Sequence, residues 1–117
     1  MDGWRWYKRP SKVVAFRPDV RRLEATIREL AKETSRIGFL THAQDRMEER
    51  GIDNVDVYRV LRTGFVQSES IKQGKRSDET VCKVIEHKKG ARDLGVVTIV
   101  VRETKLLVMT VEWEDWK

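Results

Sequence analysis

The sequence has few of the residues on which several classes of protein site depend. It contains one cysteine, Cys82, which excludes an intramolecular disulfide and a cysteine-based metal cluster. Its two histidines, His42 and His87, argue against a zinc site, and we expect neither a metal nor a cofactor. No segment approaches the roughly 18 apolar residues of a membrane-spanning helix. Because the first residues are polar and basic, we expect no signal peptide and a cytoplasmic location.

Charge, in contrast, is abundant and unevenly distributed. The formal net charge is +5, and it comes from two basic regions. Residues 1–36 hold ten Lys or Arg against five Asp or Glu, and residues 72–92 hold seven against three. Two basic regions predict a polyanionic partner such as RNA, with no membrane partner. The alternative is ordinary charge that keeps the protein soluble.

The length is that of one domain, which we expect over residues 18–117, preceded by a basic aromatic arm over residues 1–17. In the arm, Trp4, Trp6 and Tyr7 alternate with Lys and Arg. Such alternation is typical of segments that stack on bases and neutralise phosphates. The alternative is a segment whose aromatic side chains pack on the surface of the domain.

Apolar residues recur at three- and four-residue steps in the first half of the chain, which is the period of helices. We predict helices over residues 19–37, 41–50 and 54–63. Thr41 and Gln44 are spaced for a capping box at the start of the second helix, and Asp53 is placed to cap the third.

After Gly64 the period changes to that of strands. We predict strands over residues 65–72, 80–87, 95–102 and 105–113. The last two are almost continuously apolar, so we expect both of their faces to be largely covered. Helices followed by strands with short connections predict an α+β fold. It consists of three N-terminal helices packed on one face of a meandering antiparallel sheet of about four strands.

Three side chains of the second predicted helix fall on one stripe, because His42, Arg46 and Arg50 are four residues apart. The helix dipole disfavours a cation near the helix start, so His42 can accept a proton, while the arginines can hold a phosphate. A base beside cations predicts catalysis of metal-independent RNA cleavage by attack of the 2′-OH. Alternatively, the histidine bonds a strand carbonyl and the arginines pair with nearby carboxylates, including Glu48 and Glu49.

A second set of candidates lies around the predicted strand 80–87. Its cations lie on one side of that strand or in the adjoining turns, where they would line a groove for a phosphate backbone. The predicted nucleic-acid-binding residues are Lys72, Lys75, Arg76, Lys83, His87, Lys88, Lys89 and Arg92. The alternative is an edge hairpin that its charge protects against aggregation. Candidate acid–base carboxylates are Glu112, Glu114 and Asp115.

About residues 39–113 resemble a bacterial family called domain of unknown function 4258. The resemblance rests on His42-Ala43, Arg46-Met47, Arg50-Gly51-Ile52, Asp56-Val57, Val60-Leu61, Gly64 and Val108-Met109-Thr110-Val111. That family is similar to RelE-like ribonuclease toxins, and to the motility quorum-sensing regulator toxin in particular. The resemblance implies a small helix-plus-antiparallel-sheet fold, mRNA cleavage without a metal, and an antitoxin partner.

The chain departs from such toxins on its late strands. Where they commonly carry Lys, Arg or Tyr, this sequence has Val96, Val97, Glu112 and Glu114. As an enzyme, the chain would therefore depend on the stripe of the second helix and on the basic hairpin. The alternative is a non-catalytic nucleic-acid-binding or protein-interaction module on the same fold.

Overall fold

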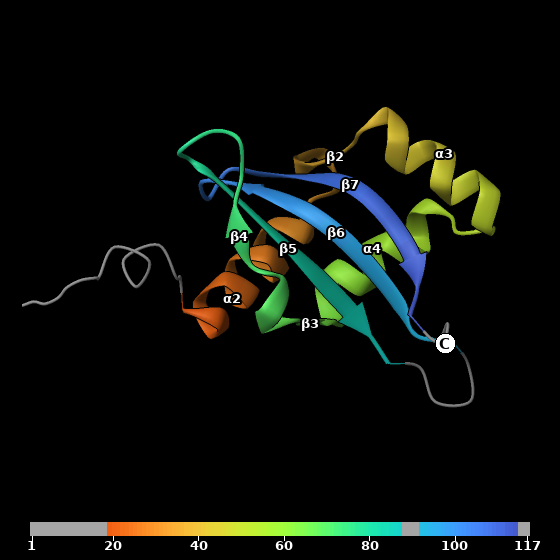
Figure 1. Cartoon of the computed structure of the whole chain (residues 1–117), viewed down its shortest axis with the longest axis horizontal. Coiled ribbons are helices and arrows are strands. Elements are labelled where there is room, and N and C mark those ends of the chain that lie inside the picture. The colour runs from red at the N-terminus through yellow and green to blue at the C-terminus, as the bar shows by residue number, and fades with distance from the viewer. Residues whose placement is uncertain (1–18, 88–91, 115–117) are drawn as a thin grey trace, which may run out of the picture.

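The computed structural model describes residues 19–87 and 92–114, so the predicted arm, Lys88, Lys89 and Asp115 lie outside the described residues. Within the described residues, three α-helices accompany one six-stranded sheet (Figure 1). The helices are α2 (Val20–Ala31), α3 (Thr41–Arg50) and α4 (Asn54–Thr63). The strands are β2 (Ile37–Phe39), β3 (Phe65–Val66), β4 (Lys72–Gln73), β5 (Glu79–Glu86), β6 (Leu94–Val101) and β7 (Lys105–Trp113).

The strand order is β2-β7-β6-β5-β3, and β4 also pairs with β5. The pairs among β3 to β7 are antiparallel, whereas β2 runs parallel to β7. The α+β prediction is confirmed, but the sheet has six strands instead of about four. The additional strands are two or three residues long, which is too short for a strand period to be visible in the sequence.

Two predicted elements were drawn too long. The first helix ends at Ala31, and Ile37 belongs to β2, where its partner is Leu106 of β7. The predicted strand over 65–72 is divided into β3 and β4 by a short 3₁₀ turn, Ser68–Ser70. In both cases pairing with a distant strand decides the local conformation, and this pairing leaves no trace in the local pattern.

The helix starts differ in how they are capped. The side chain of Asp53 accepts a hydrogen bond from the Asp56 N–H, and that of Asp56 accepts one from the Asp53 N–H, which is a reciprocal capping box. The predicted box of Thr41 and Gln44 is wrong. Thr41 is already inside α3, whose N-cap is Leu40, and the Gln44 side chain donates to the Phe39 carbonyl instead.

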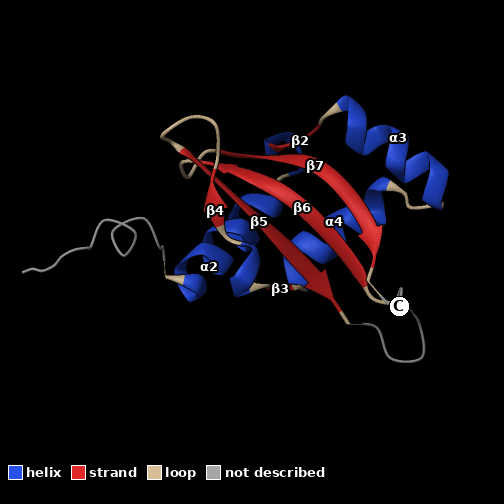
Figure 2. Cartoon of the chain, viewed as in Figure 1, coloured by secondary structure: helices blue, strands red, loops and turns tan. Residues whose placement is uncertain are grey.

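The core lies between one face of the sheet and the helices α2 and α4, which lie behind the sheet in Figure 2. Alternate residues of the long strands enter it, for example Val84, Val96 and Val108. Cys82 is fully buried there, and burial raises the pKa of its thiol to about 12. Thr98 is a buried polar residue whose hydroxyl donates to the Leu107 carbonyl at 3.1 Å.

The opposite face of the sheet is only partly covered, and we call it the open face. Val97, Ile99 and Val101 of β6 point to it and remain partly exposed. The expectation that both faces of β6 and β7 are largely covered holds fully on the core face, where α2 and α4 pack, and less completely on the open face, most of whose residues have intermediate exposure. No helix among residues 19–87 and 92–114 is long and apolar enough to cross a membrane.

Candidate nucleic-acid interface

A groove of about 580 Å³ is hollowed into the open face. Its apolar lining comes from Leu40, Val81, Ile99 and Met109, and Val81 and Ile99 are direct partners across β5 and β6. An apolar floor on a sheet can accept flat rings or aliphatic side chains. Because Leu40 directly precedes α3, the start of that helix borders the groove.

The opposite side of the groove is formed by β4 and the turn that joins it to β5, which together we call the basic turn. Lys72, Lys75 and Arg76 of this turn line the groove together with Glu79. All three cations are exposed, and their side chains form no ion pair within the described part of the chain. Three predicted nucleic-acid-binding residues thus lie together, and their positive charge is available to an anionic ligand.

Helix α3 is attached along β7. At its start the Leu40 N–H donates to the Val108 carbonyl at 3.0 Å. At its end Arg50 Nη1 donates to the Val111 carbonyl at 3.1 Å, and Trp113 Nε1 donates to the Arg50 carbonyl at 3.3 Å. The helix therefore runs beside β7, with its first turn near the groove and its last turn near the end of that strand.

The three stripe residues have different surroundings. His42 is exposed and forms no hydrogen bond or ion pair with residues 19–87 or 92–114. Arg46 Nη1 lies 2.9 Å from Glu49 Oε1, and Arg50 is held by the Val111 carbonyl. His42 is thus open to a ligand near the groove, whereas each arginine must exchange or share an existing partner.

Lys83 lies on the open face and is held by two carboxylates of the last strand. Its Nζ lies 2.7 Å from Glu112 Oε2 and 3.1 Å from Glu114 Oε2. Gly95 leaves the space that the second carboxylate occupies, since a Cβ at this position would lie 2.5 Å from Glu114 Oε2. The positive charge of Lys83 is therefore already balanced by two carboxylates, unlike the charges of the basic turn.

The three groups shift one another's proton affinity. Burial disfavours the Lys83 ammonium, but its hydrogen bonds to Glu112 and Glu114 outweigh burial and raise its pKa. The hydrogen bond from Lys83 lowers the pKa of Glu112, whereas burial raises the pKa of Glu114. The pKa values of the two neighbouring carboxyls therefore shift in opposite directions.

The raised pKa of Glu114 leads to a test by stability. A carboxyl whose pKa is higher in the folded state stabilises that state below the unfolded pKa, and this contribution is lost as the pH rises through the folded pKa. In Glu114→Gln the side chain does not titrate, so this contribution to stability does not change with pH. We expect the variant's free energy of unfolding to increase relative to wild type as the pH rises above the ordinary glutamate pKa of 4.5, measured by urea denaturation. The matched control is Glu48→Gln, an exposed position on α3; equal pH dependence in wild type and Glu114→Gln would contradict the expectation.

Two further residues of the predicted set that the structure describes, His87 and Arg92, lie at the far end of the sheet. His87 Nδ1 is 2.5 Å from Asp93 Oδ2, and its ring lies against that of Phe65. The Arg92 guanidinium lies over the Trp113 ring, with its Cζ 4.6 Å from the ring centroid. The described residues of the predicted set therefore form one group at the groove and one at the end of β5, with Lys83 between them.

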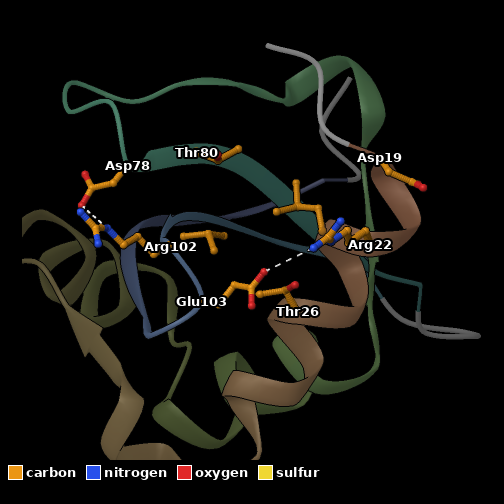
Figure 3. A pocket seen from close by; sticks show the side chains of 9 residues that line it. Asp19, Arg22, Thr26, Asp78, Thr80, Arg102 and Glu103 are labelled. Carbon is orange, nitrogen blue, oxygen red and sulfur yellow. Dashed lines mark hydrogen bonds and ion pairs between the residues drawn. The ribbon is translucent and has the colours of Figure 1, made fainter. Parts of the chain in front are cut away.

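A smaller pocket of about 150 Å³ lies between the start of α2 and the turn after β6 (Figure 3). It is lined by charged side chains, but these pair with one another. Arg22 lies 3.9 Å from Glu103, and Arg102 lies 3.3 Å from Asp78 (Figure 3). Positive charge is thus more available at the groove than here. In neither place, nor elsewhere in the described residues, do three His, Cys, Asp or Glu side chains gather as metal ligands.

A family model described as domain of unknown function (DUF4258) matches residues 39–113, from the end of β2 to the end of β7. The chain belongs to this family. The DUF4258 segment includes α3, the groove and both ends of the open face, whereas α2 precedes it. No curated protein and no solved structure matches the chain. Because the family description names no activity, the chemistry of this DUF4258 domain has to be argued from its side chains.

Sequence reasoning missed the groove floor and the partners of the charged residues. The apolar strands of the DUF4258 segment suggested burial on both faces, so a groove over the partly exposed Ile99 and Met109 was not expected. Glu112 and Glu114 were identified as carboxylates of interest, and their two-residue spacing places them on one face. That they meet Lys83 depends on the antiparallel register of β5, β6 and β7.

Proposed function

We propose that this chain is a small, toxin-like endoribonuclease that binds single-stranded RNA in the groove and cleaves it without a metal ion. The observation that supports it best is the combination of three unpaired cations with an apolar floor. Cations neutralise phosphates, and bases of any identity can stack on an apolar floor. A RelE-like fold and an antitoxin protein as partner belong to the same proposal.

The proposed chemistry uses the stripe beside the groove. His42 takes the proton of a 2′-OH, the 2′-oxygen bonds to phosphorus, and the bond from phosphorus to the 5′-oxygen breaks. The leaving oxygen takes a proton from water, and a 2′,3′-cyclic phosphate remains. Arg46, released from Glu49, and Arg50 stabilise the charge that develops on the phosphate.

The cleavage proposal is tested by incubating purified protein with single-stranded RNA in EDTA. We expect fragments with 2′,3′-cyclic phosphate ends, because the attacking oxygen belongs to the RNA itself. Fragments with other ends, or cleavage that only added divalent metal restores, would contradict the mechanism. If the protein binds RNA and never cleaves it, the proposed cleavage is contradicted and only the proposed RNA binding is supported.

Neutralising the basic turn tests the binding half. We expect the triple variant Lys72→Gln, Lys75→Gln, Arg76→Gln to bind RNA more weakly and with less dependence on salt. Each phosphate contact contributes about 0.7 to the slope of log affinity against log salt for a single strand, so three contribute about 2. Between 50 and 200 mM salt, wild type should therefore lose about 20-fold more affinity than the variant, measured by fluorescence anisotropy.

The control for this variant removes the same number of positive charges elsewhere. Arg21 and Arg22 are exposed on α2 and Lys32 is the exposed residue that follows it, on the opposite side of the sheet. Their replacement by Gln should leave the salt slope nearly unchanged, because they lie away from the groove. If wild type and the basic-turn variant show the same dependence of log affinity on log salt, the RNA does not bind at the basic turn.

A second candidate is a non-catalytic RNA-binding module on the same fold. One observation favours it: Arg46 and Arg50 already hold Glu49 and the Val111 carbonyl, which is typical of arginines that stabilise a helix. It predicts the same salt-dependent binding with no cleavage. A protein-interaction module with exposed tryptophans is less well supported, since Trp113 packs against the core, and Trp4, Trp6 and Trp116 lie outside the described residues.

A further inference from the structure

An aromatic pair lies on the open face, at the opposite end from the groove. Phe65 of β3 is the direct partner of Ile85, and His87 follows Ile85 by two residues, so all three point to the same face. The ring centroids of Phe65 and His87 are 4.9 Å apart with planes inclined at 36°. Phe65 is 39% exposed, so part of its ring is open to a ligand.

Asp93 fixes the orientation of the His87 ring. His87 Nδ1 lies 2.5 Å from Asp93 Oδ2, and an ionised carboxylate only accepts hydrogen bonds, so Nδ1 carries the proton. Asp93 is itself tied to the last strand, since its carbonyl accepts from the Glu114 N–H at 2.8 Å. His87 Nε2 therefore remains available while the ring is held, and little entropy is lost when a ligand contacts it.

The pair and the groove lie on one line along β5. Val81 lines the groove, and His87 follows it by six residues, which is about 20 Å along a strand. Lys83 and Ile85 point to the same face between them, and the charge of Lys83 is met by Glu112 of β7 and by Glu114, which directly follows that strand. A single strand held at the basic turn can therefore extend along β5 to the aromatic pair.

We infer that Phe65 and His87 form a stacking site for an unpaired nucleobase, with Asp93 as the residue that positions His87. A nucleobase has a flat apolar face and a polar edge, which match an exposed phenyl ring beside an imidazole with a free nitrogen. The inference rests on the proposed function, because it takes the RNA in the groove as its ligand. It adds a second contact point and a minimum RNA length.

The test compares two lengths of RNA. An oligonucleotide of roughly three residues fills only the groove, whereas one of about ten residues reaches both places. Loss of one stacked base costs about 1–3 kcal/mol, so we expect Phe65→Ala to bind the longer RNA about 5- to 150-fold more weakly. Its affinity for the shorter RNA should equal that of wild type. Phe65→Trp should retain the affinity for the longer RNA.

Val55→Ala is the matched control, because Val55 is an exposed apolar residue, 66% accessible, on α4. It should bind both RNAs like wild type. Unchanged binding of the longer RNA by Phe65→Ala would overturn the stacking site. Equal weakening for both lengths would overturn it too, because it would indicate damage to the groove or fold. If wild type binds neither RNA, the proposed function fails as well, which is a distinguishable result.

The role of Asp93 has a separate readout. Asp93→Asn should weaken binding of the longer RNA without affecting the shorter one. ¹⁵N NMR of the His87 ring should show the proton on Nδ1 in wild type and a mixture of tautomers in Asp93→Asn. A proton on Nε2 in wild type would overturn the positioning role. His87→Phe keeps an aromatic face but lacks Nε2 and the hydrogen bond to Asp93, so it should likewise weaken binding of the longer RNA.

Discussion

The double variant His42→Ala, Arg46→Ala should cleave RNA roughly 10²- to 10⁴-fold more slowly than wild type, measured in EDTA under single-turnover conditions. His42 is the exposed histidine beside the groove, and it is the proposed acceptor of the 2′-OH proton. Arg46 is the nearer of the two arginines that can stabilise the charged phosphate. Since both act on the chemical step, the loss should fall on the cleavage rate and leave RNA affinity largely unchanged.

The control is Glu48→Ala on the same helix, an exposed residue outside the stripe. It should cleave RNA at the wild-type rate, which would show that a substitution on α3 alone does not impair the protein. Undiminished cleavage by the double variant would remove the stripe from the mechanism and direct attention to His87. A similar loss of affinity and of rate would instead assign the stripe to binding.

Gly64→Ala should lower the free energy of unfolding by about 3 kcal/mol, at the upper end of the cost of overpacking. A Cβ at this position would lie 2.7 Å from both the Ile85 and the Val60 carbonyl oxygens. Both atoms belong to the main chain of packed elements, so neither can turn aside as a side chain can. The φ of Gly64 is −77°, an ordinary value, so the glycine is required for lack of space and not for its conformational freedom.

The matched control is Gly38→Ala in β2. Its Cβ would meet the Leu107 Cδ2 methyl at 3.0 Å, and a methyl can shift by a rotamer change. We expect a cost below about 1 kcal/mol for Gly38→Ala. Urea denaturation measures both variants, and equal stabilities of the two would contradict the steric argument. Because small domains have only about 5–15 kcal/mol of stability in total, Gly64→Ala should also melt roughly 10 °C lower.

The helices beside the site were predictable because their signals are local. The boundaries of α3 and α4 agree with the predictions over 41–50 and 54–63. An apolar period, a capping aspartate and a terminal glycine all lie within one segment of chain. By contrast, β2 and the short pieces β3 and β4 form only because a distant strand offers hydrogen bonds, which no local period records.

The sequence by itself determined which side chains are charged, which helix carries the His42–Arg46–Arg50 stripe, and which strands supply an apolar face. Only the tertiary structure decided which charges remain available. It placed Lys83 against Glu112 and Glu114, left the basic turn unpaired, and set Phe65 against His87. The physical reason is that an ion pair or a stacked pair forms between residues far apart in the chain. Strand order and register decide which of them meet.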